Sequence, residues 1–362
     1  MKILHISRTM GQGGAEKIVF QLCKDNNFQQ QFVISTGGSY VQKLDEIGVK
    51  HYKMPDINSK NPITMIICFW KIFRVVRMNK IQIVHSHHRM AAFYARLVAA
   101  LTKVQCVYTA HNIFFNKKKL LRFALKNTKI IAVGDGVKQN LVNFFGIDSK
   151  RVVVVYNSIN TKVTNIFNQD LVEAKQSGKY LVGTIGRITK QKGIDIFIKA
   201  LAEFSKVKKN TLGVIVGDGD DLELMKRLAM ELKINDKILF LGYQPNVLDI
   251  IKQLDLIVLA SRWEGLPLTP IEVFSQNNTI IATDISGNNE VVKDHYNGLL
   301  FQKNSVFELV RSMKLLSSNE LLKKRLELNA HNTFQSKYSY DRFISGYNTV
   351  YSSLSSSKHN EL

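Results

Sequence analysis

Two acidic residues stand eight positions apart in the second half of the chain, in a segment whose residue types suit a hydroxyl-rich ligand. Glu264 lies in a loop after the apolar run 256–260, and Glu272 lies inside the helix that follows. Carboxylates accept hydroxyl hydrogen bonds well, so this pair fits a ribose diol or a hexose. We expect Thr269 to be the helix N-cap and Pro270 the first helical residue, which leaves free amides for sugar hydroxyls or phosphate. A solvated surface pair is the alternative.

A basic loop earlier in the chain suits a diphosphate. Arg187 and Lys192 can converge from its two ends, between an expected strand and an expected helix. A planar guanidinium and a flexible ammonium together fit the two phosphates of a nucleotide. The alternative is that both side chains are simply solvated. The loop sequence is Gly186-Arg187-Ile188-Thr189-Lys190-Gln191-Lys192-Gly193.

A glycine-rich turn follows the first expected strand and opens the first helix. Here Gly11, Gly13 and Gly14 let the backbone approach a ligand, and the helix end offers N–H groups to an anion. A dinucleotide fingerprint would need glycine where the chain has Glu16, and the second strand ends in Thr36-Gly37-Gly38 without an acidic residue. NAD binding is therefore disfavoured, and a simple tight turn is the alternative to an anion site.

The candidate metal ligands are less persuasive. Asp218 and Asp220 form an Asp-x-Asp pattern, but it follows a strand well inside the second half of the chain. His85, His87 and His88 could ligate a metal, yet no carboxylate or cysteine lies nearby in the sequence. We therefore expect no metal, and we interpret the histidines as a strand-end loop that lines an acceptor cleft.

Short apolar runs alternate with helical stretches along the whole chain, which predicts an α/β protein with two doubly wound parallel sheets. Ligands of such sheets bind at the carboxyl ends of the strands, so a cleft between the two units is the expected site. We expect a Rossmann-like domain over residues 1–160, a second over 161–340, and a helix with a polar tail over 341–362. That helix could cross back to the first domain. The expected strands are 3–7, 32–36, 81–85, 105–110, 130–133 and 152–156, then 180–185, 212–216, 238–241, 256–260 and 279–282.

The positive charge is concentrated in the first part of the chain. The 362 residues carry a net charge of +21, of which +17 falls in residues 1–160. This asymmetry predicts an anionic partner, namely nucleic acid, an anionic membrane or a phosphorylated substrate; general solubility is the alternative. No run of about 18 apolar residues is present, so no membrane-spanning helix is expected. Three distant cysteines predict a reducing cytoplasm rather than a disulfide framework.

Together and in this order, the glycine turn, the basic loop and the acidic segment resemble the retaining glycosyltransferases of family 4, which have the GT-B fold. The resemblance covers essentially the whole chain, and the spacing Gly-Arg-x4-Lys-Gly followed by Glu-x7-Glu is specific in combination. Further matching pieces are Val84-His85-Ser86-His87, Thr109-Ala110-His111-Asn112, Tyr156-Asn157-Ser158-Ile159-Asn160, Val216-Gly217-Asp218-Gly219, Phe240-Leu241-Gly242 and Gly287-Asn288-Asn289-Glu290.

The resemblance implies a binding site for the nucleotide of a sugar-nucleotide donor. Gly13 and Gly14 would approach the donor diphosphate, and Arg187 and Lys192 would clamp it from the other side. Glu272 would bind the ribose hydroxyls. The stretch around Leu241 and Gly242 would line the base, and Gly217 is a further expected donor contact.

The resemblance also implies a site for the transferred sugar. Glu264 would lie beside this sugar, and His111 would touch it near the anomeric carbon. Backbone amides after Glu264 would bind its hydroxyls, but Pro267 replaces a glycine that is common in the family and offers no N–H. The expected contacts of this segment are Gly265, Leu266, Leu268 and Thr269.

The implied activity is retaining transfer of a hexose or N-acetylhexosamine, with a UDP-sugar as the expected donor. A lipid-linked saccharide or another cell-envelope glycan, as in capsule or exopolysaccharide synthesis, is the expected acceptor. No metal cofactor is expected. No strong base is needed if the leaving phosphate itself accepts the acceptor's proton on the same face, which is the retaining mechanism usually proposed for the family. Two alternatives remain open. One is an NDP-sugar epimerase or hydrolase on the same fold; the other is a nucleic-acid-binding protein, although the chain lacks a recognised module of that kind.

A peripheral location at the inner face of the cell membrane is expected from two basic segments. Residues 63–77 are apolar over most of their length and end with Lys71, Arg74 and Arg77; packing against the sheet is the alternative for their apolar side. Lysines near an anionic bilayer add attraction. The residues expected to bind the membrane are Lys117, Lys118, Lys119 and Arg122.

Overall fold

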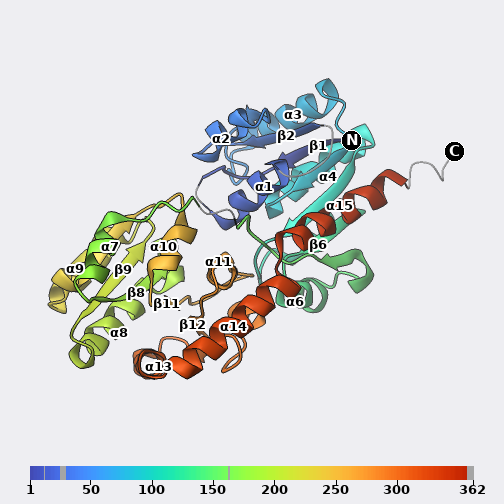
Figure 1. Ribbon diagram of the computed structural model, residues 1–362. Coiled ribbons are helices and arrows are strands. Elements are labelled where there is room, and N and C mark those ends of the chain that lie inside the picture. Colours follow the sequence, from blue (N-terminus) through green and yellow to red (C-terminus); the bar gives the residue numbers. More distant parts are fainter. Residues whose placement is uncertain (12, 25–29, 162–163, 357–362) are drawn as a thin grey trace. The chain divides into compact units, whose positions relative to one another are not determined.

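The computed structural model describes residues 1–11, 13–24, 30–161 and 164–356, and Figure 1 labels its helices and strands. The chain forms two compact units. Unit 1 contains Met1–Ser158 and the segment that begins at Tyr340, and unit 2 contains Ile159–Ser339. The chain therefore passes from one unit to the other twice.

Unit 1 is built on a seven-stranded parallel sheet in the order β3-β2-β1-β4-β5-β6-β7. Alternate residues of a strand face opposite sides, so Phe32 and Ile34 pack in one layer and Val33 packs in the other. The strands are β1 (Lys2–Ile6), β2 (Gln30–Ser35), β3 (Lys50–Lys53), β4 (Ile83–Ser86), β5 (Gln105–Ala110), β6 (Thr128–Ala132) and β7 (Val152–Val154).

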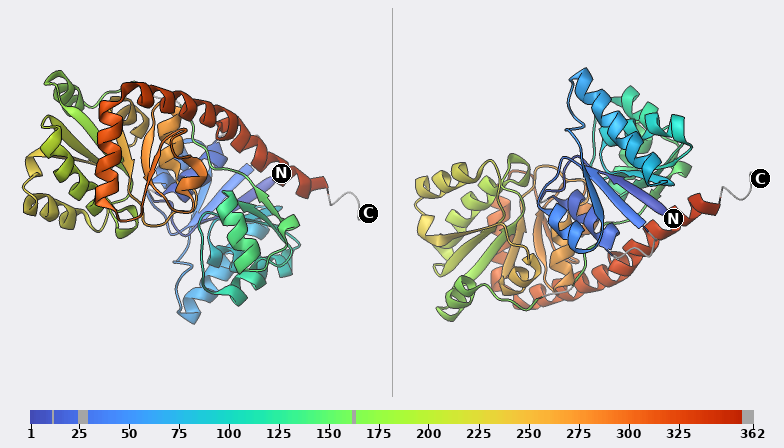
Figure 2. Two further views of the ribbon diagram at one scale, coloured as in Figure 1. Left: turned by 90° about the horizontal axis from the view of Figure 1, so that it is seen from below. Right: turned by 90° about the horizontal axis from the view of Figure 1, so that it is seen from above.

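Helices cover both faces of this sheet. Two of them, α3 and α4, share a buried cluster with β1, β2, β4 and β5, while α1 and α2 pack on the opposite face. The last helix, α15, is the red helix near the C label in Figure 2, and its Tyr351 hydroxyl reaches β4. The helices are α1 (Gly14–Lys24), α2 (Tyr40–Glu46), α3 (Pro62–Met78), α4 (Arg89–Thr102), α5 (Lys118–Ala124), α6 (Asp135–Gln139), the π-helical turn η1 (Asn140–Phe144), the 3-10 turn η2 (Ser149–Arg151) and α15 (Tyr340–Ser356).

Unit 2 repeats this plan with a six-stranded parallel sheet in the order β10-β9-β8-β11-β12-β13. Its strands are β8 (Tyr180–Ile185), β9 (Thr211–Val216), β10 (Ile238–Gly242), β11 (Leu256–Leu259), β12 (Ile280–Thr283) and β13 (Leu299–Phe301). Its helices are α7 (Gln169–Gln176), the 3-10 turn η3 (Lys190–Lys192), α8 (Ile194–Val207), α9 (Leu222–Glu231), the 3-10 turn η4 (Asn235–Lys237), α10 (Val247–Gln253), α11 (Leu268–Ser275), α12 (Asn288–Val291), α13 (Val306–Ser318) and α14 (Glu320–Lys337).

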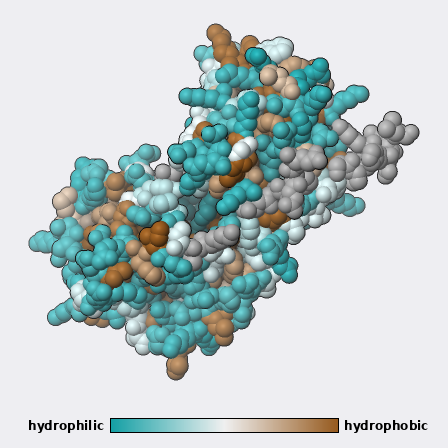
Figure 3. Space-filling model, turned by 45° about the horizontal axis from the view of Figure 1, so that its top comes forward, coloured by the Kyte–Doolittle hydropathy of each residue, from teal (hydrophilic) through white to brown (hydrophobic). Residues whose placement is uncertain are grey.

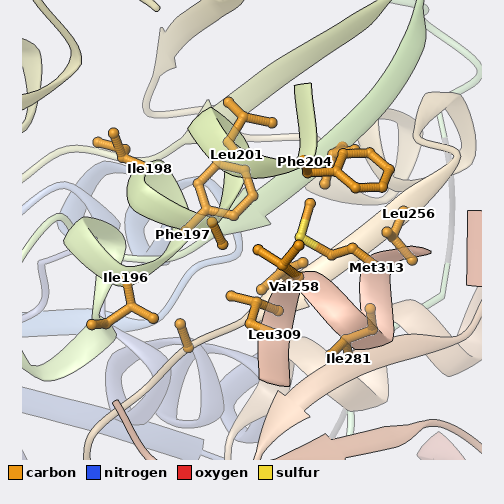
Figure 4. Packing of buried hydrophobic residues seen from close by; sticks show 14 of the residues in the cluster. Ile196, Phe197, Ile198, Leu201, Phe204, Leu256, Val258, Ile281, Leu309 and Met313 are labelled. Carbon is orange, nitrogen blue, oxygen red and sulfur yellow. The ribbon is translucent and has the colours of Figure 1, made fainter. Parts of the chain in front are cut away.

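The largest apolar contribution to the core of unit 2 comes from α8. Phe197, Leu201 and Phe204 of this helix are buried against Val258 of β11 and Met313 of α13, as Figure 4 shows. Burying an aromatic or leucine side chain of this size contributes about 1.5–3 kcal/mol. The helix is thereby fixed against the sheet, and so is the loop that precedes it.

The expected fold class is confirmed, because both units are parallel, doubly wound α/β layers. The structure adds elements that the sequence analysis did not predict: α2, β3, α7, α12 and β13. In the part of the chain that the structure describes, none of the helices is both long and apolar enough to cross a membrane.

Candidate active site

Three glycines bring the loops after β8 and β9 into backbone contact. Gly217 has a φ of +136°, and a Cβ at this position would overlap the carbonyl oxygen of Gly186. A Cβ at Gly219 would likewise overlap the carbonyl oxygen of Ile188. The Gly217 N–H donates to the Gly242 carbonyl at 2.8 Å, which ties the end of β10 to the same place. Two expected donor contacts, Gly217 and Gly242, therefore meet at the carboxyl edge of the sheet.

We expect Gly217→Ala to destabilise unit 2 by more than about 3 kcal/mol, since it combines a glycine-only φ with overlap against backbone. Gly178→Ala is the matched control. Gly178 has a φ of +76° but open space around its Cβ position, so it should cost only about 1–2 kcal/mol. Urea unfolding read from Trp263 fluorescence, with Trp70 replaced by phenylalanine, reports on unit 2; equal midpoints for the two variants would contradict the expectation.

The basic loop and the acidic segment meet in a partly buried ion pair. The Lys192 Nζ lies 2.6 Å from Glu264 Oε1, and the two side chains are 16% and 8% exposed. The Ser261 hydroxyl also donates to Glu264 Oε1, at 2.7 Å. In addition, Gln191 Nε2 donates to the Trp263 carbonyl at 2.9 Å. Two expected catalytic residues therefore lie side by side, although they are 72 positions apart in the sequence.

A second pair, missed by the sequence analysis, joins the same two loops. Both Arg262 N–H2 groups donate to the Asp195 carboxylate, at 2.7 and 2.9 Å. The Arg262 backbone N–H donates to the Gln191 carbonyl at 2.7 Å. Burial alone would raise the pKa of Asp195, but the hydrogen bonds and charge of Arg262 lower it below its ordinary value. The Arg262–Asp195 pair holds the start of α8 against the loop that carries Glu264.

Arg187 differs from Lys192 in its surroundings. Its side chain is exposed, and among the described residues no hydrogen bond or ion pair holds its guanidinium. Convergence of Arg187 with Lys192 on a diphosphate stays a prediction. An exposed guanidinium without a protein partner is available for a ligand.

The acidic segment enters α11 two residues earlier than expected. The N-cap is Pro267 in an extended conformation, so the prediction of Thr269 as the N-cap and Pro270 as the first helical residue was wrong. The Thr269 hydroxyl lies inside the helix start and donates instead to the Ile185 carbonyl at 3.5 Å. Glu272 is a buried residue of the second turn of α11.

The other expected donor contacts in unit 2 surround this helix start. Gly265 and Leu266 are buried, whereas Leu268 and Leu241 are half-buried. A Cβ at Gly287 would overlap the Gly265 carbonyl oxygen, so the loop before α12 contacts this segment closely. The Leu241 carbonyl accepts a hydrogen bond from Gln244 Nε2 at 2.8 Å.

In unit 1 the glycine turn lies against the end of β2. Gly14 is the first residue of α1, and the Gly13 carbonyl accepts the Lys17 N–H at 3.0 Å. A Cβ at Gly38 would overlap the backbone of Met10, which explains the glycine at this position. Gln12, which belongs to the same motif, lies outside the described residues.

The histidines of unit 1 are arranged differently from the sequence interpretation. His88 is the N-cap of α4, because its Nδ1 accepts the Met90 N–H at 3.2 Å. The three-histidine group that could hold a metal in the described part of the chain is instead His5, His85 and His87, with ligand atoms within 4.8 Å of one another. His5 was missed, yet the register of β1 and β4 places it directly opposite His85.

Two of these histidine rings, those of His5 and His87, form a hydrogen-bonded group that ends at His111. His87 Nδ1 lies 3.1 Å from His111 Nε2, and His87 Nε2 lies 3.1 Å from His5 Nδ1. Burial lowers the pKa of His5 and of His111 to about 4, and it lowers the pKa of His85 and His87 well below the usual value. The rings are therefore neutral at pH 7.

The expected membrane residues lie on the surface of unit 1. Lys117, Lys118 and Lys119 at the start of α5 and Arg122 in its last turn are all exposed. On α3, the inner side is buried at Cys68, Ile72, Val75 and Val76, as the packing interpretation predicts. Its outer side is nevertheless apolar, and the exposed fractions are 69% for Ile63, 58% for Ile66, 40% for Ile67 and 57% for Trp70. Brown, apolar side chains stand among teal ones on the surface in Figure 3.

Two family models match this chain, one in each half. Residues 12–163 match the model described as Glycosyltransferase Family 4. Residues 166–333 match the model described as Glycosyl transferases group 1. The matched segments thus contain both loops of the ion pair as well as the histidine group of unit 1, except for His5.

Curated relatives are similar over nearly the whole length. The chain is 23% identical to an Escherichia coli UDP-Gal:alpha-D-GlcNAc-diphosphoundecaprenol alpha-1,3-galactosyltransferase, over 97% of this chain and 94% of that protein. It is 24% identical to an N-acetyl-alpha-D-glucosaminyl L-malate synthase of Bacillus anthracis, over 78% of this chain and 77% of that protein.

Solved structures show the same fold. A glycosyltransferase from Rickettsia africae superposes with a TM-score of 0.83 at 23% identity, covering 98% of both chains. Anabaena HepE, crystallised with UDP and glucose, superposes with a TM-score of 0.86 at 17% identity, covering 98% of this chain and 100% of that one. The two matching family models, the named relatives and this shared architecture identify the chain as a glycosyltransferase of the GT-B fold, with a family 4 N-terminal half and a group 1 C-terminal half.

Proposed function

We propose that this enzyme transfers a hexose or N-acetylhexosamine from a UDP-sugar, with retention of anomeric configuration, to a lipid-linked saccharide or another cell-envelope glycan. The observation that carries the proposal is the partly buried Lys192–Glu264 pair, which lies beside the loop of the exposed Arg187 at the carboxyl edge of the unit 2 sheet. This edge is where parallel α/β sheets bind ligands.

The donor nucleotide is assigned to unit 2. Arg187 and Lys192 bind the diphosphate, and the buried carboxylate of Glu272 binds the ribose hydroxyls. Gly217, Leu241 and Gly242 lie at the ends of the neighbouring strands β9 and β10, where they line the base.

Sugar transfer follows from the charges of these groups. Cleavage of the anomeric carbon–oxygen bond leaves negative charge on the UDP diphosphate and positive character on the sugar. Arg187 and Lys192 stabilise the first, and the Glu264 carboxylate stabilises the second, without reorganisation during the step. The acceptor oxygen bonds to the anomeric carbon from the face that the diphosphate leaves and gives its proton to a departing phosphate oxygen, so the configuration is retained. Because two cations serve the diphosphate, we propose that no metal cofactor is required.

The names of similar proteins support the donor and acceptor classes. The Anabaena neighbour was crystallised with UDP and glucose, and the Escherichia coli relative is named for transfer from UDP-Gal to a diphosphoundecaprenol-linked sugar. A lipopolysaccharide 1,6-galactosyltransferase of Escherichia coli is a further relative, at 26% identity over 59% of this chain. We therefore assign this chain a UDP-sugar and an acceptor at the cell envelope.

The proposed function is tested with a set of sugar nucleotides, each measured by thermal shift and then with an undecaprenyl-diphosphate-linked saccharide. A bound donor stabilises the folded chain by mass action. We expect UDP-sugars to raise the melting temperature, a glycosylated product to form only with acceptor, and its new linkage to keep the donor's configuration. Consumption of donor without acceptor would identify a hydrolase or an epimerase instead. EDTA should leave the rate unchanged.

We further propose that unit 1 binds the cytoplasmic face of an anionic membrane. Exposed apolar residues on α3 and exposed cations at α5 occupy helices that both pack with α4, so the two surfaces belong to one side of the unit 1 sheet. Apolar side chains can enter the headgroup region while cations attract anionic lipid. A lipid-linked acceptor would be reached from such a surface.

Replacing Lys117, Lys118 and Lys119 by glutamate should weaken binding to anionic vesicles at least ~10²-fold, at about 1 kcal/mol for each lysine lost. Binding should fall steeply with salt, and neutral vesicles should bind weakly. Lys199, Lys209 and Lys314 of unit 2, exposed and equal in charge, supply the control triple variant. Vesicle co-sedimentation measures binding to both kinds of vesicle and its dependence on salt. If the protein pelleted equally with neutral and anionic lipid, attachment would be assigned to the apolar face of α3.

A further inference from the structure

Four side chains of unit 1 form a continuous line of hydrogen bonds that starts on β2 and ends at His111. Gln31 Oε1 lies 2.8 Å from His5 Nε2, and the chain continues from His5 Nδ1 to His87 Nε2 and from His87 Nδ1 to His111 Nε2, each at 3.1 Å. Gln31, His5 and His87 are buried, and His111 is half-buried. Each histidine uses one nitrogen toward each neighbour.

The backbone gives this line a direction. The Gln31 amide Nε2 donates to the Leu22 carbonyl at 2.9 Å, and a carbonyl can only accept. Its Oε1 therefore faces His5, so His5 Nε2 must carry a proton and His5 Nδ1 must be an acceptor. The same requirement passes along the line, since a neutral imidazole has one donor and one acceptor. His87 is then protonated on Nε2, and His111 is protonated on Nε2 as well.

Charged rings would break this sequence of donors and acceptors. An imidazolium donates from both nitrogens, so a protonated His87 would face a donor at one end. Burial, which lowers the pKa of all three histidines, disfavours that state at pH 7. The line therefore consists of neutral rings of one tautomer.

We propose that Gln31, His5 and His87 are positioning residues that hold His111 with its proton on Nε2 and its Nδ1 lone pair available to a ligand. In the described part of the chain, no hydrogen bond involves His111 Nδ1. This Nδ1 accepts a hydrogen bond and cannot donate one, so it selects a hydroxyl group rather than a phosphate or carboxylate oxygen. The identification of that hydroxyl with the donor sugar rests on the proposed function.

The same geometry decides against a metal at His5, His85 and His87. A metal would need lone pairs on both His5 Nδ1 and His87 Nε2, which lie 3.1 Å apart, whereas the line requires a proton between them. His85 is held separately, with Nδ1 2.6 Å from the Tyr351 hydroxyl and Nε2 2.8 Å from Thr109 Oγ1. The two interpretations are mutually exclusive and can be separated by experiment.

The test is a two-bond ¹H–¹⁵N correlation spectrum of the full chain labelled at histidine nitrogen, without donor or acceptor. We expect the Nε2–H tautomer for His5, His87 and His111, with the His111 signals assigned from His111→Gln and His51→Gln as the assignment control. Added Zn²⁺ should leave these signals unchanged. A proton on His111 Nδ1, or loss of the His5 and His87 signals on addition of Zn²⁺, would overturn the proposal.

Two variants of Gln31 test whether this residue sets the tautomer of His111. Gln31→Met removes the acceptor that sets the direction, so His111 should become a mixture of tautomers. Apparent donor affinity should then fall about twofold, as the share of the acceptor form halves, while turnover at saturating donor is unchanged. Gln31→Glu still presents an acceptor to His5 and should keep the Nε2–H tautomer. An unchanged His111 spectrum in folded Gln31→Met would contradict the proposal. Because the spectra need no substrate, this result is independent of whether the protein transfers a sugar.

Discussion

Arg187→Ala is expected to slow sugar transfer at least ~10²-fold, the scale of losing one fixed group that stabilises developing charge. The side chain is exposed and has no hydrogen-bonding partner among the described residues, so its removal leaves the packing of unit 2 intact. The loss should therefore appear in kcat/KM with an unchanged melting temperature. Steady-state kinetics with donor and acceptor, together with thermal unfolding, measure both quantities.

Two further substitutions make the Arg187 result specific. Arg187→Lys keeps the charge but loses the two-pronged hydrogen bonding of the guanidinium, so we expect it to recover only part of the rate. Arg227→Ala removes an equally exposed arginine on α9 and should leave transfer unchanged. Near-normal turnover in Arg187→Ala would mean that this loop does not bind the diphosphate.

Lys192→Ala should slow transfer by a similar factor and, unlike Arg187→Ala, should also destabilise unit 2. It leaves the Glu264 carboxylate, 8% exposed, without its cation, and breaking a buried pair on one side costs about 3–5 kcal/mol. The double variant Lys192→Met with Glu264→Gln removes both charges and should recover stability without recovering activity. Activity that returns together with stability would make the pair structural only.

The repeating strands and helices could be predicted because most of them are apolar runs of adequate length. The exceptions have a physical cause. Strand β3 reads Lys50-His51-Tyr52-Lys53 and lies at the sheet edge, where one side needs no apolar cover, so its sequence carries no strand signal. The helix α12 and the strand β13 have only four and three residues. Such short elements are defined by their neighbours rather than by their own periodicity.

The site was predictable where a residue acts within its own loop and not where strand order brings loops together. Glu264 and Lys192 stand out by type and local spacing, but their pairing depends on β8 and β11 being adjacent in the sheet. Arg262 and Asp195 meet for the same reason. His5 pairs with His85 only through the β1–β4 register. None of these neighbours can be identified from spacing along the chain alone.

The N-cap of α11 shows a different limit of prediction from the sequence. Thr269 followed by Pro270 is a good start signal, yet the chain already turns into α11 after Pro267. An extended Pro267 can precede a helix directly, and the Thr269 hydroxyl then finds the Ile185 carbonyl on the neighbouring strand β8. The Thr269 hydroxyl thus has a tertiary partner, which the sequence does not reveal, in place of the cap that local propensity predicts.

Replacing the two carboxylates of the acidic segment should affect different kinetic parameters. Glu272→Ala should weaken donor binding about 10–100-fold with little effect on kcat, because ribose contacts persist from ground state to transition state and each hydrogen bond to a charged group contributes about 1.5–3 kcal/mol. Glu264→Ala should lower kcat at least ~10²-fold with a smaller change in KM, since positive character appears on the sugar only during the reaction.

Isosteric variants separate charge from packing in this comparison. Glu264→Gln keeps an oxygen for the Ser261 hydroxyl, which donates to Glu264 Oε1 at 2.7 Å, and therefore tests the charge itself. Glu203→Gln on α8, whose carboxylate forms a surface pair with Lys206, is the control and should change neither parameter. Donor titration followed by Trp263 fluorescence gives the binding constant independently of turnover. If Glu264→Gln weakened binding and Glu272→Ala lowered kcat, the assignments of the two carboxylates would have to be exchanged, and the Lys192–Glu264 pair would then belong to the nucleotide rather than to the sugar.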